Sequence, residues 1–142
     1  MNSFQLLILC TVLPAISMAI GFSQSVQVVG KLMCHDEPAK NVKLKLYEKG
    51  VVFDSFMAED KTDSNGEFKL SGTETEISSI DPQVNIYHDC DDGWTPCQRR
   101  ISFKIPDMYI TKGTVANKPF NLGVMQLAGK YKGETRDCIH RH

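Results

Sequence analysis

Beyond residue 20 the sequence has no hydrophobic run as long as a membrane helix, which needs about 20 apolar residues. Neither sign of charge prevails, because 16 Lys and Arg stand against 17 Asp and Glu, for a formal net charge of −1. A chain without a strong basic field lacks the main attraction to nucleic acid, so nucleic acid is not expected as a partner. No segment shows the apolar spacing of a helix, and the chain is therefore not predicted to be α-helical.

The first residues form a segment of a different kind. Residues 6–20 are largely apolar, contain Cys10 and are interrupted by Pro14. This length is typical of the core of a secretory signal peptide, although no Lys or Arg precedes it. Small residues place the expected cleavage after Ala19 or Gly21. We therefore expect residues 1–21 to be a signal peptide and residues 22–142 to be one secreted, extracellular domain with a C-terminal tail; an uncleaved signal anchor is the alternative.

Loss of Cys10 with the signal peptide leaves four cysteines: Cys34, Cys90, Cys97 and Cys138. An even number of cysteines in a small exported chain indicates two disulfides, and four cysteines allow three pairings. Residues 91–96 (DDGWTP) are rich in turn formers, so Cys90 and Cys97 can meet by closing a short loop. The favoured pairing is therefore Cys90 with Cys97 and Cys34 with Cys138, and the other two pairings stay open.

Apolar residues recur at every second position along the expected mature chain. Val42, Leu44 and Leu46 alternate with polar residues, and the same pattern runs through residues 100–105. Such alternation is typical of half-buried antiparallel strands. Turn residues separate the strands, and Asn65-Gly66 in particular is a signal for a hairpin. The sequence predicts an all-β fold, an antiparallel sandwich of seven to eight strands.

Several motifs carry a resemblance to a known family. Residues 30–34 read GKLMC and residues 38–48 read PAKNVKLKLYE, followed by DKTDSNGEF at 60–68 and VNIYHDC at 84–90. With PCQRRI at 96–101, IP at 105–106 and DC at 137–138, the chain resembles the secreted, four-cysteine, nematode transthyretin-like family from about residue 26 to residue 138. The resemblance implies a transthyretin-like β-sandwich and secretion. It also implies a choice of roles, since some members bridge phosphatidylserine on dying cells to a phagocyte receptor and parasite members look like secreted effectors.

Catalysis is not expected. Transthyretin relatives that hydrolyse 5-hydroxyisourate have a His and Arg constellation and a C-terminal Tyr-Arg-Gly-Ser sequence. The nearest string here is YKGE at residues 131–134, with eight residues after it, and the family's early strand histidine is absent. Without those groups nothing orients a water or stabilises developing charge. The sequence also lacks the Gly-x-Ser-x-Gly motif of a serine nucleophile.

Metal ions and cofactors are not expected either. His35 follows Cys34, and His88 and His140 each lie two positions from a cysteine, but the tight spacings of structural zinc sites are missing. In an oxidising compartment these thiols form disulfides first. Acidic residues at 89, 91 and 92 resemble the start of a calcium loop but lack its twelfth-position Glu.

Binding is the function that the sequence favours. Arg99, Arg100 and Lys104 follow the loop that carries Trp94, and cations beside an aromatic can engage anionic lipid headgroups or an acidic receptor surface. Ordinary solvated surface is the competing interpretation of these four residues. We expect a secreted binding or bridging protein that recognises phosphatidylserine or a protein receptor. The alternative is a carrier of a small hydrophobic ligand in a channel between subunits, and the sequence does not fix the oligomeric state.

Overall fold

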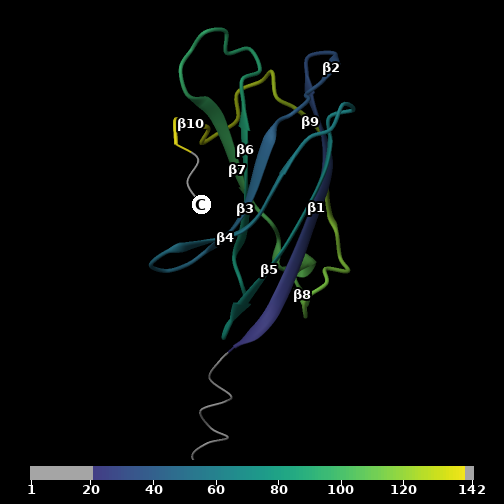
Figure 1. Ribbon diagram of the computed structural model, residues 1–142, viewed down its shortest axis with the longest axis vertical. Helices are drawn as coiled ribbons and strands as arrows, with labels where there is room; N and C mark the ends of the chain where they lie inside the picture. The colour runs from purple at the N-terminus through teal and green to yellow at the C-terminus, as the bar shows by residue number, and fades with distance from the viewer. Residues whose placement is uncertain (1–20, 140–142) are drawn as a thin grey trace, which may run out of the picture.

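The computed structural model describes residues 21–139 and shows two five-stranded sheets packed as a sandwich (Figure 1). Sheet A contains β1 (Phe22–Cys34), β2 (Glu37–Pro38), β5 (Glu67–Glu76), β8 (Thr111–Lys112) and β9 (Phe120–Gln126). Sheet B contains β3 (Lys43–Lys49), β4 (Asp54–Lys61), β6 (Pro82–His88), β7 (Gln98–Lys104) and β10 (Thr135–Asp137). A 3-10 turn, η1 (Asp107–Tyr109), follows β7. The predicted all-β sandwich is confirmed.

Seven strands have seven residues or more, and β2, β8 and β10 have two or three. The longer strands account for the seven to eight that the alternation predicts. Residues 1–20 of the expected signal peptide lie outside the described residues, and cleavage after Ala19 or Gly21 stays a prediction. Between residues 21 and 139, the structure contains no helix with the length and hydrophobicity needed to cross a membrane.

Sheet A is built around β1, the longest strand. β1 pairs antiparallel with β5 on one side and with β8 on the other, whereas its pairing with β9 is parallel. The parallel pair is the one exception to the antiparallel pairing between the described strands. A parallel pair needs a long connection, and the segment from β7 through η1 and β8 to β9 supplies it.

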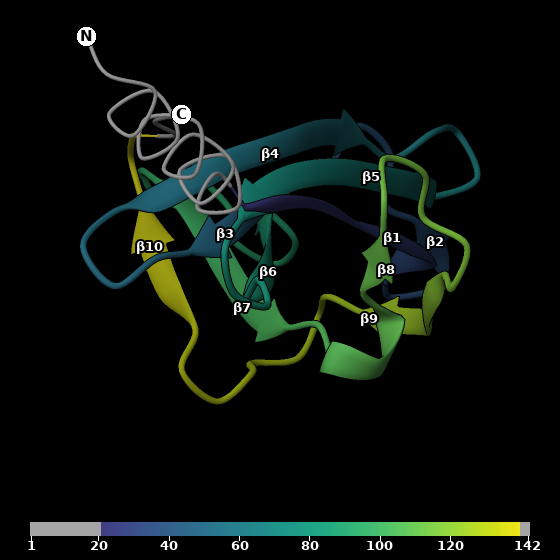
Figure 2. The same cartoon turned by 90° about the horizontal axis from the view of Figure 1, so that it is seen from below.

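Sheet B is antiparallel throughout, in the order β10-β7-β6-β3-β4. Leu44 and Leu46 of β3 are fully buried and face sheet A, as their alternation predicts. Figure 2 shows the two layers from below, with β10 forming the far edge of sheet B. Lys45, which lies between Leu44 and Leu46 in β3, is on the opposite, outer face of sheet B.

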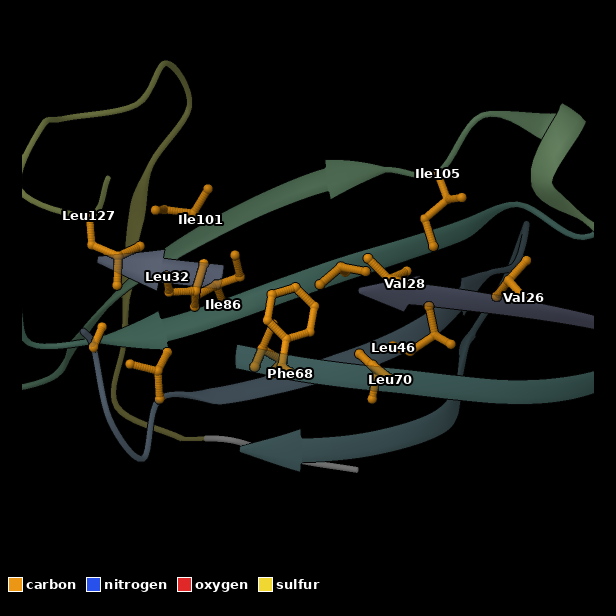
Figure 3. Close-up of a cluster of buried hydrophobic side chains, with 14 of the residues drawn as sticks. Val26, Val28, Leu32, Leu46, Phe68, Leu70, Ile86, Ile101, Ile105 and Leu127 are labelled. Carbon is orange, nitrogen blue, oxygen red and sulfur yellow. The ribbon is translucent and has the colours of Figure 1, made fainter. Parts of the chain in front are cut away.

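The core lies between the sheets (Figure 3). Phe68 and Leu70 of β5 are buried there, and Ile105 closes the end of the core. Burial of each large apolar side chain stabilises the fold by about 1.5–3 kcal/mol relative to exposure. The remaining fully buried aliphatic side chains of the cluster come from both sheets and from the residue after β9: Val26, Val28, Leu32, Leu44, Leu46, Val84, Ile86 and Leu127.

The turn at Asn65-Gly66 is present, but the predicted hairpin is wrong, because β4 belongs to sheet B and β5 to sheet A. The Gly66 N–H donates to the Asp63 carbonyl at 3.0 Å, and Gly66 has a φ of +75°. A Cβ on Gly66 would lie 2.3 Å from the Leu32 carbonyl oxygen. Local turn chemistry was visible in the sequence, whereas the change of sheet depends on distant packing.

The favoured disulfide pairing is also wrong, although all four cysteines do form disulfides. Cys34 bonds to Cys90 and Cys97 bonds to Cys138. The pairing follows strand order: β10 lies antiparallel beside β7, which places Cys138 next to Cys97. The first disulfide joins the end of β1 in sheet A to the loop after β6 in sheet B. Closeness in sequence favoured Cys90 with Cys97, and the sheet overrides it.

Candidate functional site

The structure does not gather the four predicted ligand-binding residues into one site. Trp94 is fully exposed in the loop between β6 and β7. Arg99 pairs in register with His88, beside that loop, whereas Lys104 pairs with Gln83 at the other end of β6. The two ends of the predicted set therefore lie at opposite ends of sheet B.

Arg99 is a buried structural residue. Its guanidinium donates to the carbonyls of Cys90 (2.7 Å), Leu127 (3.3 Å) and Gly129 (2.7 Å), and twice to the Glu134 carboxylate. Arginine has five N–H donors, and here each has a partner within the protein. This arrangement leaves the side chain no free donor for a ligand.

The other two predicted cations also have acidic partners. Arg100 Nη1 lies 2.9 Å from an Asp137 oxygen, and its Nε donates to Thr135 Oγ1 at 3.1 Å. Lys104 Nζ lies 3.1 Å from Asp81 in an exposed pair. Paired cations attract an anionic lipid less strongly than free ones, because the neighbouring carboxylates offset their field.

A hollow of about 330 Å³ opens on the outer face of sheet B. It crosses the sheet from β4 to β10 and continues to the residue after Cys138. Its walls combine aromatic, amide and ion-paired side chains: Tyr47, Lys49, Asp54, Gln83, Asn85, Tyr87, Arg100, Asp137 and Ile139. We refer to this feature as the hollow.

A chain of hydrogen bonds organises the floor of the hollow. The Gln83 amide donates to Asn85 Oδ1 at 3.0 Å, and Ser102 Oγ donates to the same oxygen at 2.8 Å. Asn85 Nδ2 in turn donates to the Tyr87 hydroxyl at 3.2 Å. Burial, together with the neighbouring Tyr87, raises the pKa of Tyr47 to about 12. Tyr47 therefore keeps its proton, and its hydroxyl shares a hydrogen bond with the Tyr87 hydroxyl.

The hollow contains groups suited to binding. Its lining residues include neither a histidine nor a cysteine to act as nucleophile or general base.

The YKGE sequence at residues 131–134, compared above with the hydrolase motif, has a structural role. The Tyr131 hydroxyl donates to the Gln126 carbonyl at 2.7 Å, and Glu134 pairs with Arg99.

The turn between β3 and β4 is apolar and exposed, which the sequence analysis missed. Val51, Val52 and Phe53 have exposures of 105%, 77% and 81%. We refer to residues 51–53 as the hairpin tip. Figures 1 and 2 both show this turn projecting away from the sandwich. Three consecutive apolar residues between Gly50 and Asp54 were the signal in the sequence, because a turn normally favours polar residues.

One cluster of potential metal ligands occurs among residues 21–139. Atoms of Cys34, His35 and Asp91 lie within 4.8 Å of one another. The Cys34 sulfur is part of a disulfide, and His35 Nε2 lies 2.6 Å from Asp91 Oδ1. Two exposed side chains that bind each other do not complete a metal centre.

Comparison with known proteins fixes the family. The model of the Transthyretin-like family matches residues 29–106, more than half of the chain. The chain belongs to the transthyretin-like family. It is 48% identical to Transthyretin-like protein 5 of Caenorhabditis elegans over 95% of this chain and 98% of that protein. It is 46% identical to Transthyretin-like protein 33 of the same organism, over 96% and 94% of the two chains.

A likeness to a solved structure is weaker. A 9R-lipoxygenase from Cyanothece aligns with a TM-score of 0.43 and 19% identity, over 73% of this chain and 16% of the lipoxygenase. This score is too low to bear on fold or function. Family membership, as predicted from the motifs, is thus established by the relatives in Caenorhabditis elegans.

Proposed function

We propose that this family member is a secreted, extracellular bridging protein that uses the two ends of sheet B to contact two partners. The observation that carries the proposal is the exposure of large apolar side chains at both ends. In β3 and β6, Glu48 pairs with Pro82 and Lys43 pairs with Tyr87. The turn between β3 and β4 therefore lies beyond one end of these strands, and the loop between β6 and β7, which carries Trp94, lies beyond the other.

The hairpin tip is suited to a lipid surface. It is convex and carries three consecutive apolar side chains, which gain free energy on leaving water. At its base Lys49 Nζ lies 2.5 Å from Asp54, so the cation next to the tip is paired. Insertion of the tip would then depend mainly on apolar burial and only weakly on the charge of the headgroups.

The Trp94 loop is suited to a protein receptor. Both cysteines that flank it are in disulfides, and Asp92 within it accepts two hydrogen bonds from Arg136. An exposed tryptophan on a loop held in this way loses little conformational entropy on binding, and tryptophan is enriched at the energetic centres of protein interfaces. The disulfides also support an extracellular location, because they persist in oxidising compartments.

Vesicle flotation tests the lipid contact. We expect the secreted protein to float with phosphatidylcholine vesicles and with vesicles that also contain phosphatidylserine, and the double variant Val52→Ser, Phe53→Ser to lose flotation with both. The matched control is Val115→Ser, a similarly exposed valine outside the tip. Equal flotation of the tip variant and the control would rule out the tip as the lipid contact, and strict dependence on phosphatidylserine would assign recognition to headgroup charge instead.

A tethering assay tests the second contact. Fluorescent vesicles are added to dissociated Caenorhabditis elegans cells with wild-type protein or with Trp94→Ala. We expect Trp94→Ala to float with vesicles like the wild type but to lose vesicle–cell tethering. Tethering that survives the substitution would show that the Trp94 loop is not the receptor contact, whatever the outcome for the hairpin tip.

A further inference from the structure

Lys45 occupies an unusual position on the outer face of sheet B. It lies on β3 between Asn85 of β6 and Glu59 of β4, and its side chain is fully buried. Within the described part of the chain, its ammonium nitrogen has no hydrogen-bond partner. The nitrogen lies 5.8 Å from the centre of the Tyr87 ring, and a ring face at this distance offsets only part of the lost hydration.

The carboxylates around Lys45 are each engaged by another cation. Glu59 pairs with Lys43 at 3.1 Å, and Asp137 pairs with Arg100 at 2.9 Å. Each of these ion pairs is neutral overall, so the charge of Lys45 is not neutralised by any ion pair between described residues. Burial of this charge is costly and lowers the pKa of Lys45, and the nearby charges of Glu59 and Asp137 offset the lowering only in part. A ligand that brought one negative charge would remove that cost.

Lys45 does not itself line the hollow, but its neighbours do. Three of the hollow's lining residues surround Lys45: Tyr47 two positions along β3, Asn85 opposite it, and Tyr87, whose ring it approaches. Both tyrosine hydroxyls can donate or accept hydrogen bonds, and Asn85 adds an amide. Ile139 and the ring of Tyr47 supply apolar surface in the same hollow. A volume of about 330 Å³ suits a small organic molecule.

We propose that the hollow binds a small organic monocarboxylate, with the carboxylate at the Tyr47 and Tyr87 hydroxyls, next to the Lys45 ammonium, and the apolar part of the ligand against the Tyr47 ring and Ile139. A single unneutralised cation matches one negative charge. The site belongs to one chain, unlike the channel between subunits that the carrier hypothesis requires. It uses neither the hairpin tip nor Trp94, so it is independent of the bridging function.

Titration followed by NMR tests the proposal on the intact disulfide-bonded protein, with hexanoate as the probe and hexanamide as its neutral counterpart. We expect hexanoate to shift the backbone amides of Tyr47, Asn85 and Tyr87, and hexanamide to bind at least roughly tenfold more weakly, as expected for loss of a charged hydrogen bond. Absence of shifts with hexanoate, or equal affinity for the two probes, would overturn the proposal.

Two further measurements connect the binding to Lys45 itself. Lys45→Met keeps an unbranched side chain of similar volume and removes its charge, and we expect it to weaken hexanoate binding at least roughly tenfold. Lys61→Met, at an exposed lysine of β4, is the matched control and should bind as the wild type does. In the wild type, hexanoate should raise the pKa of the Lys45 ammonium, measured through the NMR signal of its Cε. An unchanged affinity in Lys45→Met, or an unchanged pKa, would assign binding to another group.

Discussion

The Arg99 guanidinium and the Glu134 carboxylate form a two-point ion pair, with Nη2–Oε1 at 2.8 Å and Nε–Oε2 at 3.2 Å. The two side chains are only 8% and 5% exposed. The same guanidinium holds three backbone carbonyls, two of which belong to the segment between β9 and β10. Arg99 thus fastens the C-terminal part of the chain to β7, and sheet B depends on it for the position of β10.

Loss of the ion pair between Arg99 and Glu134 should destabilise the fold. Arg99→Ala leaves the Glu134 carboxylate buried without a partner, and we expect it to reduce the free energy of unfolding by about 3–5 kcal/mol. Arg100→Ala is the control, because its pair with Asp137 is more exposed and should contribute about 1 kcal/mol or less. Urea unfolding measures both. Similar losses in the two variants would contradict the structural role assigned to Arg99.

The disulfide pairing can be read from peptides of the non-reduced protein. Cleavage by trypsin alone leaves Cys90 and Cys97 on one peptide, because no Lys or Arg lies between them. A second protease that cuts before Asp91 separates the two cysteines. We expect mass spectrometry to find Cys34 linked to Cys90 and Cys97 linked to Cys138. A link between Cys90 and Cys97 would instead support the pairing that sequence proximity favoured.

The strands of sheet B could be predicted because their signal is local. The alternation through Leu44 and Leu46 needs only the period of a strand and a one-sided core. The burial of Arg99 could not be predicted, because it depends on Glu134, which lies 35 positions away and reaches β7 only through β10. The predicted disulfide pairing was wrong for the same reason. Sequence proximity is a poor guide where strands distant in the chain become neighbours in a sheet.

Lys45 shows a second limit. Alternation correctly places it on the outer face of β3, and an outer-face lysine is normally solvated. The structure buries it instead, with its ammonium nitrogen 5.8 Å from the centre of the Tyr87 ring. The hollow depends on which side chains meet across five strands, and period-two alternation carries no information about that.

His88 should make the protein sensitive to acid. Its side chain is buried, and Nδ1 accepts a hydrogen bond from the Cys90 N–H at 3.1 Å. Burial, and then the nearby Arg99 charge, lower the pKa of His88 from its ordinary value of 6.5. Below about pH 6.5 the histidine is therefore protonated in the unfolded chain while it is still neutral in the folded protein. The stability contributed by neutral His88 is present above this pH and falls as the pH decreases.

Urea unfolding at several values between roughly pH 7.5 and pH 5 measures this effect. We expect the free energy of unfolding to decrease across the range in the wild type and to change less in His88→Gln. The two proteins are compared at every pH, so that the contributions of the groups they share cancel and the difference reports His88. An identical pH dependence in His88→Gln and the wild type would show that His88 is not the group responsible.

Lys45→Met should preserve or increase stability, in contrast to Arg99→Ala. Replacement of an unpaired buried ammonium by an apolar side chain of similar volume removes a desolvation penalty, and we expect a gain of about 1–4 kcal/mol at neutral pH. The pKa of Lys45 is lowered by burial from 10.5, so the unfolded chain binds the additional proton between the folded pKa and 10.5. The wild type therefore regains stability relative to Lys45→Met as the pH rises through that interval. The difference between their unfolding curves isolates Lys45, because other groups titrate alike in both. With Lys61→Met as the reference for loss of an exposed lysine, a clear loss of stability in Lys45→Met would mean that the ammonium is satisfied in the folded protein and needs no ligand.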